Sequence, residues 1–235
     1  MLLARLLIAL IPLCCCSGVS LHTGYKFVIL GGTGRIGTAV ASHLLLKSPD
    51  AQIILVGRDE RKGVKAVEEV LSERSGSVRW EFVENGWDVK NKKLLALLEE
   101  ADCLVHTAGP YLGEQPTPLK LAIQAKCSTY IDVSDPLDFL EASLQFAEEA
   151  ETSGTTALLA AGAFPGMSNV LGVESAAKLP AGFKTKDIRF NYFTAGLGGS
   201  GDVNLYITNL GFGEPMAQFE HGKLRLYESL SGLLL

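Results

Sequence analysis

The amino-acid sequence predicts an α/β fold, namely a doubly wound Rossmann-type parallel sheet followed by the start of a smaller α+β domain. Short β-prone apolar runs alternate with helix-like segments from Tyr25 to Ala160, and the first run stops at a glycine-rich turn. Strands that alternate with helices form a parallel sheet, with right-handed crossovers and helices on both faces. This is a nucleotide-binding architecture.

Each predicted element follows from its local pattern. Short apolar runs that end at turn residues indicate strands, and apolar residues at spacings of three and four indicate helices. The second helix is expected to carry Val64, Val67, Val70 and Leu71 on its apolar face, and Pro118 begins a later helix. In chain order, the predicted elements are a strand over Tyr25–Leu30, a helix that ends before Ser48-Pro49, a strand over Gln52–Val56 that ends at Gly57-Arg58, the amphipathic second helix, a strand over Val78–Val83, a short helix over Lys92–Leu98, a buried strand over Cys103–Thr107, a helix over Pro118–Ala125, a strand over Thr129–Val133, a long helix over Pro136–Thr152 and an apolar strand over Thr156–Ala160.

The pattern changes around Gly162–Gly166, after which we expect a second, α+β domain to begin. At about 150 residues per domain, 235 residues amount to about one and a half domains. The predicted organisation is a hydrophobic leader over residues 1–22, a dinucleotide-binding domain over 24–165 and a partial second domain over 166–235. The expected elements of the second domain are a helix over Met167–Ala177, a strand over Ile188–Phe193, a glycine-rich segment over Gly196–Gly201, a helix over Asp202–Leu210 and a hairpin over Ala217–Tyr227 that turns near His221-Gly222.

Composition and charge exclude several classes of protein. The chain is 47% hydrophobic and 20% charged, which excludes a disordered polyelectrolyte. Its 21 basic and 26 acidic residues give a net charge of −5 without a basic block, so no nucleic-acid partner is expected. Of five cysteines, only Cys103 and Cys127 lie outside the adjacent group at positions 14–16, and no metal-ligand spacing occurs. Neither a disulfide framework nor a metal site is therefore expected.

The N-terminal segment has the layout of a secretory signal. It is apolar except for Arg5, with an apolar run over Leu6–Leu13 and small residues near Ser17 and Gly18. The run is shorter than the about 20 residues that a membrane span needs, so we expect no membrane association apart from this leader. A plastid targeting segment, acylation of the three adjacent cysteines and a misassigned start codon stay open. The expected compartment is the secretory pathway or the plastid, and otherwise the cytoplasm.

The turn after the first strand fits the binding of a dinucleotide. It matches Gly-x-Gly-x-x-Gly at Gly32, Gly34 and Gly37, between a predicted strand and a predicted helix. Glycine is needed there because a β-carbon would block the turn, the approach of the pyrophosphate and the packing of the helix on the strand. Amides at the helix N-terminus then face the phosphates. The predicted cofactor-binding residues of this turn are Gly31, Gly32, Thr33, Gly34, Arg35, Ile36 and Gly37.

The residue that follows the second strand favours NADP over NAD. NAD enzymes usually carry Asp or Glu there, which holds the ribose 2'-hydroxyl. This chain has Arg58, whose guanidinium can bind a 2'-phosphate in a charge-assisted fork, with Lys62 nearby. Asp59 is interpreted as the N-cap of the following helix. Asp88, just after the third strand, either contacts the adenine or caps a helix.

Several other catalytic motifs are absent from the sequence. No tyrosine lies four residues before a lysine, and the GxSxG, GxxxxGK[ST] and HExxH patterns do not occur. The acid/base pair of short-chain dehydrogenases, an esterase, a P-loop kinase and a zincin are thus excluded. His106, in the fourth strand, is interpreted as a core or sheet-end histidine rather than a base, and Cys103 and Cys127 as core residues. No catalytic residue is predicted.

Several spaced motifs occur in order along the chain and together carry a family resemblance. They are Val28-Ile29-Leu30-Gly31-Gly32-Thr33-Gly34-Arg35-Ile36-Gly37, Gly57-Arg58, His106-Thr107-Ala108-Gly109-Pro110-Tyr111, Tyr130-Ile131-Asp132-Val133-Ser134-Asp135, Gly162-Ala163-Phe164-Pro165-Gly166-Met167-Ser168-Asn169 and Tyr192-Phe193-Thr194-Ala195-Gly196. With these motifs the chain resembles the saccharopine dehydrogenase-like family, in particular its plant and algal branch. The similarity extends from Tyr25 to about Tyr227.

The resemblance implies an NADP-binding oxidoreductase with a Rossmann domain and a substrate domain. It places Ala108, Gly109 and Pro110 beside the nicotinamide, in agreement with ligand binding at the carboxyl ends of strands. The leading hypothesis is hydride transfer to or from a small substrate, at a carbon bonded to nitrogen or within a polarised double bond. The alternative is a noncatalytic NADP-binding sensor or scaffold. Family members continue beyond the predicted hairpin, so we expect a truncated chain that binds cofactor but turns over poorly, and a homo-oligomer stays open.

Overall fold

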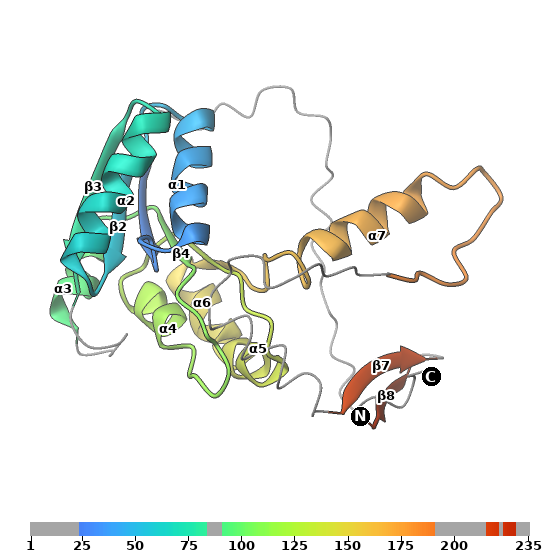
Figure 1. Cartoon of the computed structure of the whole chain (residues 1–235). Helices are drawn as coiled ribbons and strands as arrows, with labels where there is room; N and C mark the ends of the chain where they lie inside the picture. The colour runs from blue at the N-terminus through green and yellow to red at the C-terminus, as the bar shows by residue number, and fades with distance from the viewer. Residues whose placement is uncertain (1–23, 84–90, 191–214, 221–222, 229–235) are drawn as a thin grey trace.

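A six-stranded parallel sheet forms the centre of the structure (Figure 1). The computed structural model describes residues 24–83, 91–190, 215–220 and 223–228. The strand order is β3-β2-β1-β4-β5-β6, so the chain winds outward in both directions from the middle of the sheet, which confirms the predicted doubly wound α/β fold. The strands of this sheet are β1 (Lys26–Leu30), β2 (Gln52–Gly57), β3 (Ser77–Phe82), β4 (Cys103–His106), β5 (Thr129–Asp132) and β6 (Thr156–Leu158).

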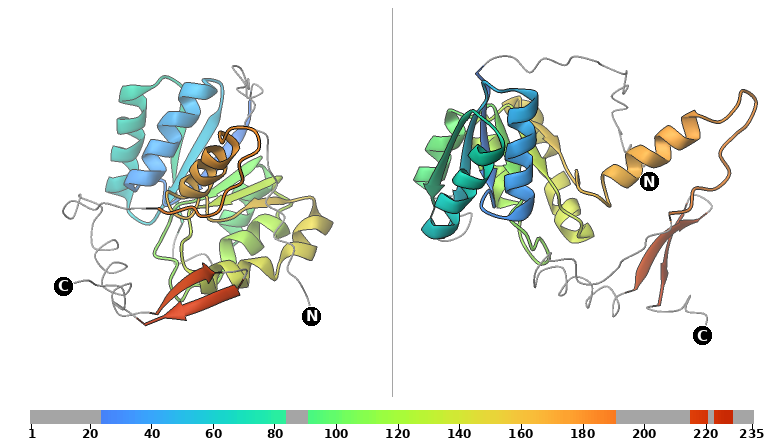
Figure 2. Two further views of the ribbon diagram at one scale, coloured as in Figure 1. Left: turned by 90° about the vertical axis from the view of Figure 1, so that its right-hand side faces the viewer. Right: turned by 45° about the horizontal axis from the view of Figure 1, so that its top comes forward.

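Helices cover both faces of the sheet, as Figures 1 and 2 show. The helices around it are α1 (Arg35–Lys47), α2 (Glu60–Glu73), α3 (Lys92–Glu99), α4 (Thr117–Gln124), α5 (Leu137–Leu144) and α6 (Ala147–Ser153). Because side chains alternate along a strand, Val28 and Leu30 enter one core with α3, α4 and α6. Phe27 and Ile29 enter the opposite core with α1 and α2. Both sides of β1 are therefore buried, as expected for a central parallel strand.

The long helix predicted over Pro136–Thr152 is wrong, because the structure divides this segment into α5 and α6. Phe146 separates the two helices and serves as the N-cap residue of α6. The division lets the two helices bury different residues: α5 buries Phe139, while α6 buries Ala150. Phe146 itself packs against the core on that face. The periodicity of the sequence did not show this change of direction.

The apolar face predicted for α2 is also wrong in part. Val64 and Leu71 are 50% and 41% exposed, and the residues that α2 buries are Gly63, Ala66 and Val70. The physical reason is the aromatic side chain of the neighbouring strand β3. A β-carbon at position 63 would overlap the Trp80 ring, so the helix turns its smallest residues toward the sheet.

The chain after β6 leaves the sheet. Helix α7 (Met167–Ala177) has the predicted bounds, and it projects away from the sheet in both figures. The predicted hairpin is confirmed, because β7 (Met216–Glu220) and β8 (Lys223–Tyr227) pair antiparallel. The strand predicted over Ile188–Phe193 is not present in its described part, residues 188–190. The glycine-rich segment 196–201 and the helix predicted over 202–210 lie outside the described residues, and the domain boundaries stay a prediction.

Two further sequence predictions fall on residues that the structure does not describe. They are the leader over residues 1–22 and the role of Asp88. Within the described ranges, no helix has the length and apolar character that a membrane crossing requires.

Candidate functional site

The predicted cofactor-binding residues that the structure describes gather at the carboxyl edge of the sheet. The glycine turn follows β1, Arg58 follows β2, and Ala108-Gly109-Pro110 follows β4. Strand β1 pairs with both β2 and β4, with Leu30 opposite Val56 on one side and His106 on the other. All three segments therefore leave the sheet side by side. This is the crevice at the point where the strand order reverses, which is where ligands bind in open α/β sheets.

Three glycines of the turn are required by the packing of the protein itself. Gly31 has a φ of +71°, and a β-carbon there would lie 2.8 Å from the Cα of Ala108. A β-carbon on Gly32 would lie 2.8 Å from the carbonyl oxygen of Ile29, and one on Gly37 would lie 2.5 Å from the carbonyl oxygen of Gly31. The glycine turn thus packs closely against β1, the start of α1 and the loop after β4.

Gly34 is different, because a side chain there would meet fewer atoms of the protein, at a longer distance. A β-carbon there would meet only the carbonyl oxygen of Gly31, at 3.3 Å. Gly34 is also the N-cap residue of the 13-residue helix α1, and it supplies no capping side chain. The N-terminus of α1 therefore lies at this edge of the sheet, where the helix dipole attracts an anion. An open approach and a positive helix end are what a pyrophosphate needs.

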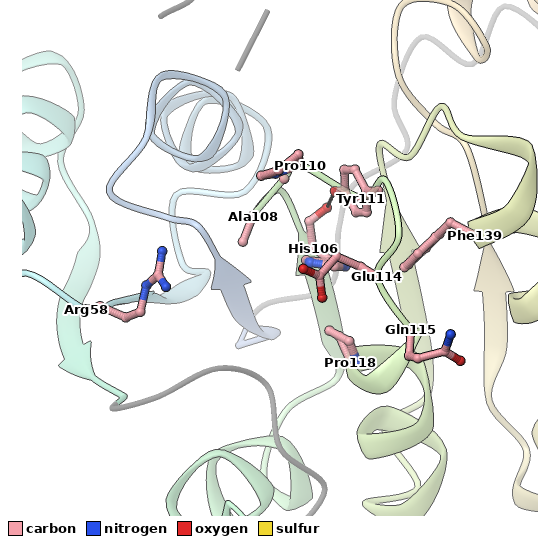
Figure 3. Close-up of a pocket in the computed structure, with 10 residues that line it drawn as sticks. Arg58, His106, Ala108, Pro110, Tyr111, Glu114, Gln115, Pro118 and Phe139 are labelled. Atoms are coloured by element: carbon pink, nitrogen blue, oxygen red, sulfur yellow. Dashed lines mark hydrogen bonds between the residues drawn. The ribbon is translucent and has the colours of Figure 1, made fainter. Parts of the chain in front are cut away.

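Arg58 lines a pocket together with residues of the loop after β4 (Figure 3). The pocket encloses about 200 Å³, less than the about 300–1,000 Å³ of a complete ligand site. In Figure 3, Arg58 lies on one side of the pocket, Ala108 lies between, and His106 and Phe139 lie across from it. The lining residues are Arg58, His106, Ala108, Gly109, Pro110, Tyr111, Glu114, Gln115, Pro118 and Phe139.

The residues on both sides of Arg58 are held by contacts of their own. The carboxylate of Asp59 accepts a hydrogen bond from the Lys62 amide at 3.1 Å, which confirms Asp59 as the N-cap of α2. Its negative charge is thereby directed to the helix end. A β-carbon on Gly57 would lie 2.8 Å from the Thr33 side chain, so the glycine turn rests directly on the end of β2. Arg58 and the turn consequently flank one crevice.

A buried polar and aromatic cluster lies beneath the loop after β4. His106 is 3% exposed, and its Nδ1 is hydrogen-bonded to the Tyr130 hydroxyl at 3.1 Å. The Tyr111 hydroxyl donates to the carbonyl oxygen of His106 at 2.7 Å, and the Tyr111 ring packs edge-on against Phe139. Burial lowers the pKa of His106 to about 4, so its imidazole is neutral near pH 7. This confirms His106 as a buried sheet-end histidine.

Sequence reasoning missed the role of Asp132 at the end of β5. Asp132 is fully buried, and its Oδ1 accepts hydrogen bonds from the Ser134 amide, the Ser134 hydroxyl and the Ala160 amide, at 3.1, 2.7 and 2.8 Å. The available signal was a carboxylate directly after the apolar strand residues Tyr130 and Ile131. A buried carboxylate needs hydrogen-bond partners, so the position of Asp132 in the sequence could have indicated a buried polar site.

Residues 27–158 match the family described as the saccharopine dehydrogenase NADP-binding domain. The match covers more than half of the 235 residues. The chain belongs to this family. Membership confirms the family resemblance and NADP as the cofactor of the domain, in agreement with the arginine that follows β2.

Proteins similar to the chain include a relative in each of two strains of Mycobacterium tuberculosis, H37Rv and CDC 1551, both named "Putative trans-acting enoyl reductase". Each is 29% identical over 139 residues, which cover 59% of this chain and 32% of the relative. The chain therefore matches about a third of their length.

Among solved structures, a short-chain type dehydrogenase/reductase from Mycobacterium ulcerans is 17% identical, with a TM-score of 0.44 over 57% of this chain and 65% of the other. A metagenomic short-chain oxidoreductase in complex with NADP is 20% identical, with a TM-score of 0.42 over 58% of this chain and 81% of the other. The fold assignment rests on the strand order of the sheet itself.

Proposed function

We propose that the protein is an NADP-dependent oxidoreductase that transfers a hydride to or from a small substrate. The proposal rests on one observation within this NADP-binding domain: Arg58 and the loop after β4 line the same pocket at the carboxyl edge of the sheet. Cofactor and substrate meet at this edge in proteins of this architecture. The cofactor, when bound, supplies the hydride chemistry, and the protein supplies binding and orientation.

The residues at the crevice divide into three proposed contacts. The glycine turn and the amides of Arg35, Ile36 and Gly37 at the start of α1 would hold the pyrophosphate. Arg58 would bind the 2'-phosphate of the adenosine through a charge-assisted fork. The turn Ala108–Pro110 would lie along the nicotinamide. Asp88 is proposed at the adenine, after β3. The looser packing around Gly34 than around the other glycines of the turn and the N-cap role of Asp59 support these assignments.

Two chemical classes of substrate stay in the proposal. The names of the Mycobacterium tuberculosis relatives support a polarised carbon–carbon double bond, whereas the name of the family supports a carbon bonded to nitrogen. Either reaction needs the substrate carbon held close to the nicotinamide with water excluded. His106 is neutral and tied to Tyr130, so we assign it no proton-transfer step.

Several sequence predictions stay predictions beside this proposal. They concern the plant and algal branch, the truncated substrate domain, a secretory or plastid destination and a homo-oligomer. No observation on the described residues favours the noncatalytic sensor or scaffold over the oxidoreductase.

The test is oxidation of NADPH, followed at 340 nm, with two substrates: an α,β-unsaturated thioester and an imine formed from a 2-oxo acid and an amine. We expect substrate-dependent oxidation with one class, and a higher kcat/KM with NADPH than with NADH. Tight NADPH binding without turnover on either class, both in this chain and in a version extended to the length of the Mycobacterium tuberculosis relatives, would contradict the oxidoreductase and favour the noncatalytic alternative. Absence of NADPH binding would contradict the cofactor site itself.

A further inference from the structure

Asp132 joins the carboxyl ends of two neighbouring strands at the proposed site. Three hydrogen bonds converge on its Oδ1, two from Ser134 just after β5 and one from Ala160 just after β6. The carbonyl oxygen of Asp132 also accepts a hydrogen bond from the Ala161 amide at 2.8 Å. A single fully buried residue thus fixes the exits of β5 and β6 relative to each other.

The segment that Asp132 holds after β6 is conformationally strained. Ala160 has a φ of +56°, in the left-handed region that non-glycine residues rarely occupy. Such conformations persist where the surroundings fix them, and they gather at functional sites. Here the amide of this strained residue donates directly to Asp132 at 2.8 Å. The chain then continues into the Gly162–Gly166 turn.

Asp132 also faces the cluster beneath the loop after β4. His106 is its partner in the β4–β5 register, and Tyr130 precedes it by two residues on the same side of β5. The charge of Asp132 opposes the lowering of the His106 pKa that burial causes. After the Ala108–Pro110 segment, the Tyr111 hydroxyl donates a hydrogen bond to the carbonyl oxygen of His106. The Ala108–Pro110 turn is therefore fixed at both of its ends beside Asp132.

We infer that Asp132 is a positioning residue for the nicotinamide half of the NADP site, acting through the exits of β4, β5 and β6. The inference rests on the proposed function, because it assumes that the nicotinamide lies along Ala108–Pro110. The glycine turn follows β1 and Arg58 follows β2, whereas the hydrogen bonds to the Asp132 side chain come from Ser134 and Ala160. The two halves of the cofactor should consequently respond differently when Asp132 is changed.

The experiment compares two ligands by isothermal titration calorimetry. NADPH occupies both halves of the site, whereas adenosine 2',5'-bisphosphate carries the 2'-phosphate and no nicotinamide. For Asp132→Ala we expect the NADPH dissociation constant to rise about 3- to 10-fold, with that of the bisphosphate within about 2-fold of wild type. The enhancement of NADPH fluorescence on binding, which reports the nicotinamide, should fall in parallel. Asp132→Asn keeps an acceptor oxygen and should restore most of both signals.

Two further variants keep the inference testable. Asp102→Ala is the matched control, because this carboxylate accepts from the Lys26 amide at 2.8 Å and joins β1 to β4 at the amino end of the sheet, away from the site. It should lower stability without changing the ratio of the two affinities. If Asp132→Ala does not fold, Ser134→Ala removes one of the three hydrogen bonds and should shift the same ratio by about 2- to 3-fold.

The possible results separate the inference from the proposed function. Parallel losses for both ligands, or an unchanged ratio in Asp132→Ala and Ser134→Ala, would mean a purely structural role and overturn the inference. Failure of the wild-type protein to bind either ligand would overturn the proposed site as well.

Discussion

Gly34 differs from the other glycines of the turn in what a side chain would displace. Side chains on Gly31, Gly32 or Gly37 would collide with the protein's own backbone, whereas a β-carbon on Gly34 would meet only the carbonyl oxygen of Gly31, at 3.3 Å. A substitution at position 34 therefore affects a ligand more than it affects the fold. This makes Gly34 a better test of phosphate binding than its neighbours.

We predict that Gly34→Val abolishes the binding of NADPH and NADH, because its branched side chain occupies the approach of the pyrophosphate. The fold should survive, since loss of a glycine N-cap costs at most about 1–2 kcal/mol. Calorimetric titration and far-ultraviolet circular dichroism measure the two effects. Ala39→Val adds similar bulk on an exposed position of α1 and should leave binding intact. Retained affinity in Gly34→Val would show that the turn is only a connection.

His106 gives the protein a predicted pH dependence of stability. Its pKa is about 4 in the folded protein and about 6.5 when exposed, so the unfolded state takes up a proton first as pH falls. Stability should therefore decrease between pH 6.5 and 4, by up to about 3 kcal/mol. Urea unfolding at several pH values should show this slope in wild type and a smaller one in His106→Gln. Equal slopes in both proteins would assign the pH dependence to other groups.

At the residue scale, the sequence predicted the contacts that depend on local order. The glycine turn and Arg58 could be placed because each directly follows a recognisable strand. Asp59 was recognised as a cap for the same reason. The position of Asp132 could have indicated a buried polar site, but its partner Ala160 could not be predicted, because Ala160 follows β6 and only the β5–β6 pairing brings the two together.

At the scale of elements, close packing between α2 and β3 determines which face of the helix is buried. Gly63 lies against the Trp80 ring, and the apolar residues Val64 and Leu71 are left partly exposed. The hydrophobic pattern alone favoured the larger residues for the buried face. It failed because the indole of Trp80 fills the space that a side chain on the helix would need.

We predict that Gly63→Ala destabilises the protein, although alanine is the better helix former. Overpacking against Trp80 costs about 1–3 kcal/mol, which exceeds the gain of about 1 kcal/mol in helix propensity. The free energy of unfolding in urea measures the net effect. Val64→Ala, at the adjacent and half-exposed position, should change stability by less. A more stable Gly63→Ala protein would mean that the Trp80 ring moves freely aside.

The strands of the six-stranded sheet and most helices around it were predictable within one or two residues, because their apolar runs are short and bounded by glycine, proline or a cap. The bounds of α7 and the β7–β8 hairpin also agree with the sequence pattern. The division between α5 and α6 was not predictable. It depends on Phe139 packing against Tyr111 while Ala150 enters the core, which are tertiary contacts of two different helices.

At the scale of the whole molecule, the strand order places two chemically different regions on either side of β1. One side carries Arg58 after β2, and the other carries the buried cluster of His106, Tyr111 and Tyr130 at the ends of β4 and β5. A charged adenosine phosphate suits the first side and an uncharged dihydronicotinamide ring suits the second. The central claim is therefore that the crevice binds NADPH in this one orientation.

The most direct test of this claim is calorimetric titration of wild type, Arg58→Ala and Arg61→Ala with NADPH and NADH. Arg61 is an exposed arginine of α2 outside the pocket and serves as the matched control. Loss of a charge-assisted hydrogen bond costs about 1.5–3 kcal/mol, so Arg58→Ala should weaken NADPH binding by about 10- to 150-fold and barely change NADH binding. Arg61→Ala should change neither. Equal losses of both cofactors in Arg58→Ala, or wild-type preference for NADH, would contradict the claim.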